Sequence, residues 1–320
     1  MRVQPLRHLC NKALSFYTKR LKKSTVLGGV LFNFQKSFLA DCKLPPRKGF
    51  DFPKICDIMD KTHIRNTFMA PKNILAQRSN KVIYRDGDKL IKLFDESYSK
   101  SNIFNEALGQ TRVAETGLNV PKIHEVTVIG GKSAIVMDFI EGDTLEELLK
   151  KYPGKRGELL ALFVKTQREV HAKKHLLLTK YADKLRMKIL QSDLAASTRY
   201  DLAMRLDGMR RHTHVLQGDF VPRNVVVKKD GTPYIVDWSH VSQGNATADG
   251  AKTYLLLLSA GLSSLAEEYR KLFCKAAGVE DKYFVEWLPL VSAAQLIRAE
   301  TPERRAFLMH YVEENTDDEI

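Results

Sequence analysis

The fold is decided by the stretch HVLQGDFVPRNVVVKKDGTPYIVDWSH, which spans residues 214–240. Two short runs of β-branched and aromatic residues, 225–227 and 234–236, flank the pair Asp230-Gly231. Such runs around Asp-Gly are the pattern of a β-hairpin. A two-residue turn would set one strand register, and a longer loop caused by Pro233 would shift it. The stretch therefore predicts a hairpin whose register depends on its loop.

Three polar residues flank this hairpin: Asp219, Asn224 and Asp237. A two-residue turn would place Asn224 opposite Asp237, with Cβ atoms about 4.5–5.5 Å apart. Amide and carboxylate oxygens at that spacing suit one Mg²⁺ ion. Phosphoryl transfer uses this order of residues, a base for the hydroxyl proton followed by two ligands for the metal on the phosphates. An ordinary hairpin with surface acids is the plainer interpretation, and the joint pattern makes it the weaker one.

The segment resembles the catalytic loop and metal-binding strand of the aminoglycoside phosphotransferase family, small-molecule phosphotransferases with a kinase-like fold. The residues that carry the resemblance are Gln-Gly-Asp-Phe-Val-Pro-Arg-Asn at 217–224 and Ile-Val-Asp-Trp at 235–238. The resemblance implies that Asp219 is the catalytic base. It also implies that Asn224 and Asp237 belong to the catalytic set as Mg²⁺ ligands, and that ATP, or alternatively GTP, is the phosphoryl donor.

Two residues depart from the family pattern. Gln217 stands where the family usually has His, and Val221 stands where a His or Lys is common. We expect Gln217 to affect the loop architecture, because Gln can both donate and accept hydrogen bonds. Val221 removes a cation near the transferring phosphate, and Arg223 is a candidate to replace it.

Upstream, the pattern predicts strands at 81–85 and 89–94 and a helix over 102–116. Lys92 lies on the apolar face of its strand, where the plainer interpretation is an edge-strand lysine that discourages aggregation. In the resembling family a strand lysine contacts the phosphates and pairs with a helix glutamate. The resemblance implies that Lys92 and Glu106 form this pair at the nucleotide site.

Two further segments are expected to contact the nucleotide by resemblance, the loop at 77–80 and the strand at 134–140. The loop has no glycine, which counts against a protein kinase, because those enzymes use a glycine-rich loop over the phosphates. The strand would present its backbone to the adenine edge. The residues of these segments that the resemblance places at the nucleotide are Ser79, Met137, Asp138, Phe139 and Ile140.

The second half of the chain is predicted to be mostly helical, over 157–175, 181–209 and 290–313. A helix is also expected to begin at about Asn245. His171 is predicted to be a packed histidine and not a metal ligand. Asp249 matches a family acid that braces the catalytic loop, although an acid in a first helical turn also has a plain structural reason.

The net charge of +13 comes mostly from residues 1–58, which carry 12 Lys/Arg and 3 Asp/Glu. The remaining 39 basic and 35 acidic residues give only +4, so composition argues against nucleic-acid binding. Membrane-surface contact or targeting by residues 1–40 is the less favoured alternative to a poorly ordered extension. No apolar run reaches the roughly 18 residues of a membrane span, and four cysteines without a C-x-x-C pair fit the cytoplasm.

These observations predict an α+β fold of two lobes, like that of protein kinases. The expected parts are the extension 1–58, an N-lobe at 59–141 with an antiparallel sheet and one helix, and a helical C-lobe at 142–320. The predicted function is an ATP-dependent phosphotransferase that uses Mg²⁺ and acts on a hydroxyl of a small molecule. A pseudokinase that serves as an interaction module and an atypical protein kinase remain the alternatives.

Overall fold

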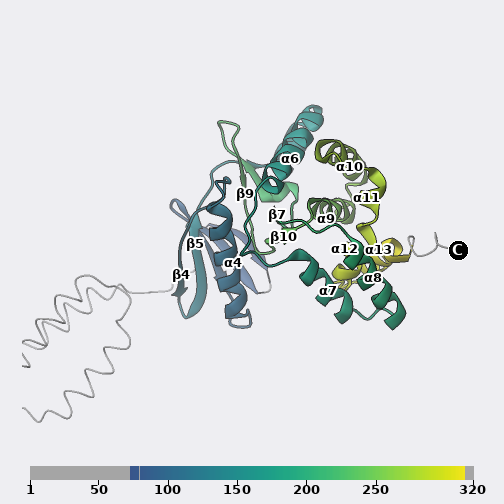
Figure 1. Cartoon of the computed structure of the whole chain (residues 1–320). Coiled ribbons are helices and arrows are strands. Elements are labelled where there is room, and N and C mark those ends of the chain that lie inside the picture. Colours follow the sequence, from purple (N-terminus) through teal and green to yellow (C-terminus); the bar gives the residue numbers. More distant parts are fainter. Residues whose placement is uncertain (1–72, 79, 314–320) are drawn as a thin grey trace, which may run out of the picture. The chain divides into compact units, whose positions relative to one another are not determined.

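A computed structural model of the protein describes residues 73–78 and 80–313 (Figure 1). The expectations for residues 1–58 and for Ser79 lie outside these residues. The first part of the described chain is a five-stranded sheet in the order β1-β2-β3-β5-β4, with every neighbouring pair antiparallel. The strands are β1 Ile74–Arg78, β2 Lys81–Asp86, β3 Lys89–Phe94, β4 Ile123–Ile129 and β5 Lys132–Asp138.

The predicted hairpin of β2 and β3 is present and closes through a tight turn. Asp86 pairs with Lys89, which leaves Gly87 and Asp88 as the two turn residues. Gly87 has φ +61°, a conformation that glycine adopts without a steric penalty. The register places Lys92 opposite Ile83 on one side and Ile135 on the other, in the middle of the sheet.

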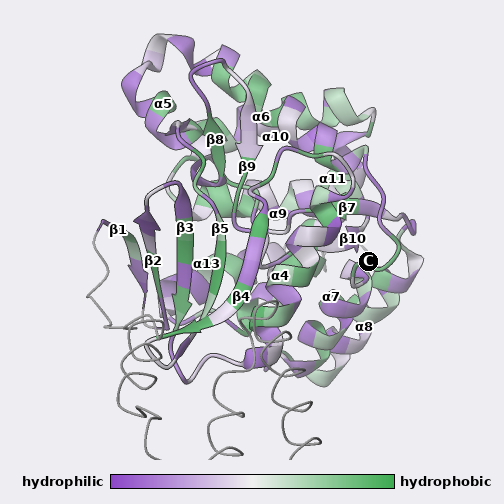
Figure 2. Cartoon of the chain, turned by 90° about the vertical axis from the view of Figure 1, so that its left-hand side faces the viewer, coloured by the Kyte–Doolittle hydropathy of each residue, from purple (hydrophilic) through white to green (hydrophobic). Residues whose placement is uncertain are grey.

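One helix, α4 Lys100–Ala114, covers one face of this sheet (Figure 1). The apolar side chains between them belong to β3, β5 and α4: Phe94, Ile135, Met137, Ile103 and Ala107. Figure 2 shows that the two central strands, β3 and β5, are largely hydrophobic in sequence. Lys92 and Phe94 are two residues apart on β3, and side chains at that spacing point to the same face of a strand. Lys92 therefore points to the face that carries this cluster and toward α4.

The rest of the described chain is mostly helical, with a core of its own around the buried side chains of Trp238, Phe163 and Tyr269. Among the described residues, no helix is long and apolar enough to cross a membrane. The α-helices are α5 Leu145–Lys151, α6 Arg156–His171, α7 Tyr181–Gln191, α8 Ala196–Gly208, α9 Ala246–Ser259, α10 Ser263–Ala277, α11 Asp281–Val285, α12 Leu288–Leu296 and α13 Pro302–Glu313.

Short strands lie in the segments between these helices. One three-stranded sheet has the order β6-β8-β9, and a second pair joins β10 to β7. Their bounds are β6 Asp143–Thr144, β7 His214–Leu216, β8 Val225–Val227, β9 Pro233–Ile235 and β10 Ser242–Gly244, with the 3-10 turns η1 Pro153–Lys155 and η2 Pro222–Asn224. The α+β architecture predicted from the sequence, a small antiparallel sheet with one helix followed by a helical part, is confirmed.

Two long helical predictions were wrong in detail, because each run contains a break. The run 181–209 divides into α7 and α8 at Ser192, whose backbone is extended and whose hydroxyl donates to the carbonyl of Ile189 at 2.7 Å. The run 290–313 divides into α12 and α13 before Pro302, since a proline disfavours helical backbone in the residue that precedes it.

Candidate active site

The central hairpin forms, but its loop is longer than two residues. Val225 pairs with Ile235, and the amide of Val236 donates to the carbonyl of Asn224 at 2.9 Å. The amide of Thr232 donates to the Asp230 carboxylate at 2.9 Å, which stabilises a loop ahead of Pro233. The predicted pairing of Asn224 with Asp237 is therefore wrong by one position, as the alternative with a longer loop anticipated.

Asp237 leaves the hairpin in a left-handed backbone conformation, with φ +56°. Gln217 holds this turn, because its side-chain amide donates to the carbonyls of Val236 at 3.2 Å and Asp237 at 2.8 Å. The oxygen of the same side chain accepts the amide of Asp219 at 2.6 Å. Gln217 is fully buried and joins the catalytic loop to the end of the hairpin, so the expected role in loop architecture is confirmed.

Asp219 and Asn224 lie in contact within one loop. The side-chain amide of Asn224 donates to the backbone carbonyl of Asp219 at 2.8 Å and to its Oδ2 at 3.2 Å. Arg223 approaches the same Oδ2 at 3.6 Å. Burial raises the pKa of Asp219 above its ordinary value, and the positive charges of Lys252 and Arg223 oppose part of that rise. The carboxylate is thus oriented and more basic than a solvated one.

Gly218 fixes the path of the loop just before Asp219. Its φ is +79°, and a Cβ at this position would lie 2.7 Å from the carbonyl oxygen of His240, so the site requires glycine. Its amide donates to Asp249 Oδ1 at 3.0 Å, and Asp249 Oδ2 contacts Nε2 of the buried His171 at 3.0 Å. Asp249 braces the loop as expected, and His171, predicted to be packed, is buried and supports that brace.

Lys92 connects the sheet to the end of the hairpin. Its Nζ lies 2.6 Å from Glu106 Oε1 on α4 and 2.9 Å from Asp237 Oδ1. Burial alone would lower the pKa of Lys92, but the two carboxylates outweigh burial and raise it. Burial alone would raise the pKa of Asp237, and Lys92 followed by Lys81 outweighs that and lowers it. Both partners therefore stay charged at neutral pH.

The predicted adenine-contacting residues lie at the end of β5, and the structure shows how their polar groups are used. The Phe139 amide donates to the Asp88 carbonyl at 2.9 Å, and the Asp138 carboxylate contacts His124 Nε2 at 2.7 Å. Met137 is buried against α4. The contacts of Met137, Asp138, Phe139 and Ile140 with a nucleotide stay a prediction.

A family model described as "Phosphotransferase enzyme family" matches residues 72–288, more than half of the chain. The chain belongs to this family. The predicted family and the predicted enzyme class, a phosphotransferase, are thereby confirmed. No curated protein sequence matches the chain.

Solved structures similar to this phosphotransferase share its fold at low sequence identity. A choline/ethanolamine kinase family protein from Mesorhizobium loti has a TM-score of 0.53 at 16% identity, covering 77% of this chain and 90% of that one. A thermostable mutant of the aminoglycoside phosphotransferase APH(4)-Ia, in ternary complex with ADP and hygromycin B, has a TM-score of 0.57 at 12% identity, covering 75% and 91%. The choline kinase LicA from Streptococcus pneumoniae has a TM-score of 0.50 at 14% identity, covering 84% and 92%. The predicted kinase-like fold is confirmed.

The residues of this phosphotransferase fit a Mg²⁺ ion held together with nucleotide phosphates. Asn224 uses its amide nitrogen toward Asp219, so its oxygen takes no part in those contacts. Within the described part of the chain, no group of three or more His, Cys, Asp or Glu side chains could hold a metal ion. Mg²⁺ does not need such a group, because it commonly binds one or two carboxylates together with substrate phosphates.

One functional candidate was missed at the sequence level, the lysine Lys252 on α9. Its ammonium group donates to the backbone carbonyl of Gly218, directly before Asp219. The signal that could have found it is the spacing from Asp249, because side chains three residues apart on a helix lie on the same face. Asp249 and Lys252 therefore reach the same loop.

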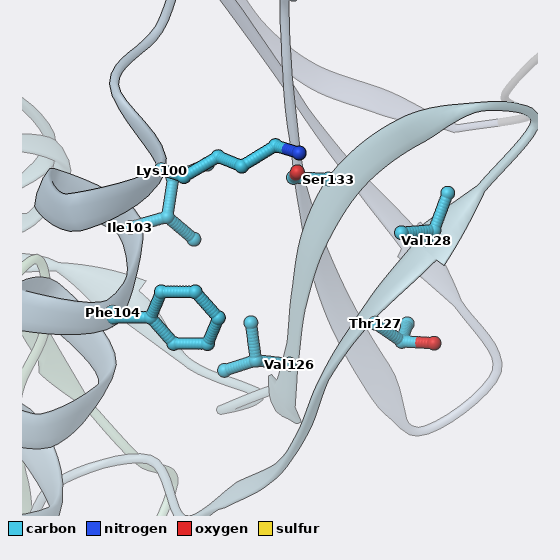
Figure 3. A pocket seen from close by; sticks show the side chains of 7 residues that line it. All are labelled: Lys100, Ile103, Phe104, Val126, Thr127, Val128 and Ser133. Atoms are coloured by element: carbon cyan, nitrogen blue, oxygen red, sulfur yellow. The ribbon is translucent and has the colours of Figure 1, made fainter. Parts of the chain in front are cut away.

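A hollow of about 180 Å³ lies elsewhere, between α4 and the strands β4 and β5 (Figure 3). Its lining is mostly apolar and includes Phe104, Val126 and Val128, with Lys100 at its margin. None of the predicted site residues lines this hollow. It is therefore a feature of the sheet–helix layer and not part of the candidate active site.

Proposed function

We propose that this phosphotransferase moves the γ-phosphoryl group of ATP to a hydroxyl group of a small molecule. The observation that carries the proposal is the double ion pair of Lys92, at 2.6 Å from Glu106 and 2.9 Å from Asp237. It joins the lysine of the sheet to the acid at the end of the hairpin. The same hairpin follows the loop that orients Asp219, so the groups needed for phosphoryl transfer converge.

In this proposal Asp219 is the base that accepts the hydroxyl proton of the acceptor. Its raised pKa supports the role, because a general base works best when its pKa is closer to the working pH. Asn224 and Arg223 hold the carboxylate in place. We infer a positioning role for Gln217, since it fixes the backbone amide of Asp219.

The oxygen of Asn224 and the carboxylate of Asp237 would hold Mg²⁺. When bound, Mg²⁺ neutralises charge on the phosphate oxygens. Lys92 would contact the phosphates from the sheet side, with Glu106 keeping its ammonium group in place. A buried lysine held by a carboxylate is better oriented than a mobile one, and orientation accounts for much of the rate in such reactions.

The solved structure of APH(4)-Ia with ADP and hygromycin B supports a nucleotide donor and a small-molecule acceptor for this chain. ATP is the donor that we propose, with GTP as the alternative.

The test is thermal unfolding of the full chain with and without Mg²⁺-ATP, on the wild type and on Asp237→Asn. A ligand at 100 times its dissociation constant stabilises a protein by about 2.7 kcal/mol. We expect a magnesium-dependent shift in the wild type that is lost in Asp237→Asn. Asp230→Asn is the matched control, because it makes the same change in the exposed loop of the same hairpin. A folded wild type without a shift would contradict the proposal.

A second variant separates binding from the chemical step. Asp219→Asn should keep the Mg²⁺-ATP shift, because the nucleotide ligands are unchanged. Transfer to an acceptor should fall by about 10²–10⁴-fold, the range typical of general base catalysis, as measured by ADP release. Full transfer activity in Asp219→Asn would remove the base role from this residue.

A further inference from the structure

Four basic side chains from three parts of the helical region gather beside the catalytic loop. They are Lys184 and Lys188 on α7, Lys252 on α9 and Arg298 just after α12, and we call them the basic cluster. The proposed roles of the phosphotransferase site do not use any of them. Because the four side chains come from separate elements, the cluster forms only when the chain folds, and the sequence contains no charged run that corresponds to it.

Two of these lysines contact the backbone around Gly218. Lys252 donates to the Gly218 carbonyl, and Lys184 donates to the Val241 carbonyl at 2.8 Å. Gly218 packs against His240, the residue before Val241. Both ammonium groups therefore bind the two segments that meet at Gly218, the residue before Asp219.

The other two members of the cluster are Lys188 and Arg298. Lys188 follows Lys184 by one helical turn, so the two share a face of α7. Burial, followed by the charges of Lys252, Arg298 and Lys184 in that order, lowers the pKa of Lys188 to about 8. Burial, followed by Lys252, likewise lowers the pKa of Lys184 to about 8. The positive charges of the cluster therefore act on one another.

The cluster faces fewer negative charges than the four positive charges it contains. Within the described part of the chain, none of its four members forms an ion pair, whereas Lys92 has two. The acids that face Lys252 are Asp219 and Asp249, and Asp249 is already engaged by the Gly218 amide and His171. His240, which also faces the cluster, has its pKa lowered to about 3 by burial and by Lys252, Arg298 and Lys188, so it adds no charge.

Three half-buried lysines and the exposed Arg298 give a surplus of positive charge beside the proposed base, which favours binding of an anion from outside the chain. We propose that the acceptor carries an anionic group, a phosphate ester or a carboxylate, which binds the basic cluster while its hydroxyl group faces Asp219. The inference rests on the proposed phosphoryl transfer, whose acceptor it narrows to a chemical class. The same charges disfavour a cationic acceptor such as an amino alcohol.

The test uses the full chain with its nucleotide site filled by Mg²⁺ and AMP-PNP. Inorganic phosphate, acetate and tetramethylammonium are titrated at constant ionic strength, and binding is followed by calorimetry. We expect phosphate or acetate to bind, and tetramethylammonium not to bind. The phosphate and acetate arms distinguish the two anion types.

Lys184→Met with Lys188→Met should weaken anion binding by at least about tenfold, since methionine keeps the apolar stem and removes the charge. Lys271→Met with Lys275→Met is the matched control, an exposed pair one turn apart on α10. If the double variant does not fold, Lys188→Gln alone serves, because Lys188 makes no backbone contact like that of Lys184 with any residue that the structure describes.

Anion binding that is absent, or that persists unchanged in the α7 variants, overturns the inference, and so does preferred binding of tetramethylammonium. These results differ from a failure of the proposed function. That failure would show as the absence of any magnesium-dependent stabilisation by AMP-PNP, before an anion is added.

Discussion

At the scale of single residues, Asp237 has a charge that the fold depends on. Its folded pKa is lowered by Lys92 and Lys81 against the effect of burial, so its contribution to stability is complete above the ordinary carboxyl pKa of 3.8 and is lost as the pH falls below it. Asp237→Asn keeps the shape and tolerates the left-handed backbone.

We therefore expect Asp237→Asn to destabilise the protein at neutral pH by up to about 3 kcal/mol, because it breaks one of the two ion pairs of a buried lysine. Its stability should also fall less steeply than that of the wild type as the solution becomes acidic. Urea unfolding over a pH series measures both effects. Parallel pH profiles for the two proteins would show that the ion pair does not govern acid stability.

Gln217 is a second residue whose side chain makes hydrogen bonds with a measurable contribution to stability. Gln217→Ala removes one accepted and two donated hydrogen bonds and leaves buried backbone groups without partners, which should cost about 2–3 kcal/mol. Gln217→His should cost less, because a neutral imidazole also donates and accepts. Chemical unfolding gives the values, with the exposed Gln191→Ala as the control. Equal losses for Ala and His would mean that packing, not hydrogen bonding, sets the requirement.

Some residues of the site can be predicted from the sequence, and others cannot. Asp219, Asn224 and Asp237 lie within one short stretch, and their spacing is a property of the local motif. Lys252 lies on another helix and reaches Gly218 only through the tertiary fold. Local spacing therefore predicts the loop residues and cannot predict a side chain that arrives from a distant helix.

At the scale of secondary-structure elements, the connection after β5 passes close to the hairpin. A Cβ on Gly142 would lie 2.3 Å from the carbonyl oxygen of Val227 on β8, a backbone atom that cannot move aside easily. Gly142→Ala should therefore destabilise the protein by about 1–3 kcal/mol, as overpacking does.

Gly157→Ala on α6 is the matched control, because nothing lies within 4 Å of its added Cβ. It should leave stability unchanged or raise it by up to about 1 kcal/mol, since alanine favours helix. Thermal unfolding compares the two variants. A Gly142→Ala protein as stable as the wild type would show that the β8 strand can shift.

Helix α7 should give anion binding a pH dependence. Lys184 and Lys188 each have a pKa of about 8, so both lose their charge as the pH rises through that value. An anion whose own charge is constant, such as sulfate, should bind more weakly above that pH, by about tenfold if binding raises one lysine pKa by one unit. Calorimetry of nucleotide-filled protein checks this, and Lys184→Met with Lys188→Met should show a flat profile.

The elements themselves were largely predictable, and their interruptions were less so. The alternation of apolar residues indicates β2 and β3, and the helical pattern indicates α4 to within two residues. The break at Ser192 depends on hydrogen bonds that a periodic pattern does not contain. The hairpin register depends on how the Asp230 side chain closes the loop, which is a local choice between turn types.

At the scale of the whole molecule, the sequence predicts the lobes because each has its own apolar pattern. The arrangement of elements around the catalytic loop is different, because α7, α9 and the segment after α12 each present only one or two of the basic side chains. Their surplus of charge exists only once the helices pack together. The surplus of positive charge, from which we infer an anionic acceptor, is thus a property of the assembled fold, and no single segment encodes it.

Lys92 also bears on how the two halves of the molecule can move. One of its ion pairs, with Glu106, lies within the layer formed by the sheet and α4, and the other, with Asp237, joins that layer to the hairpin. If the sheet swings away from the helical half, the first pair travels with the lysine and only the second breaks. Such a movement would therefore leave no unpaired ammonium group in the interior, because Glu106 would keep Lys92 charged and oriented until the halves meet again.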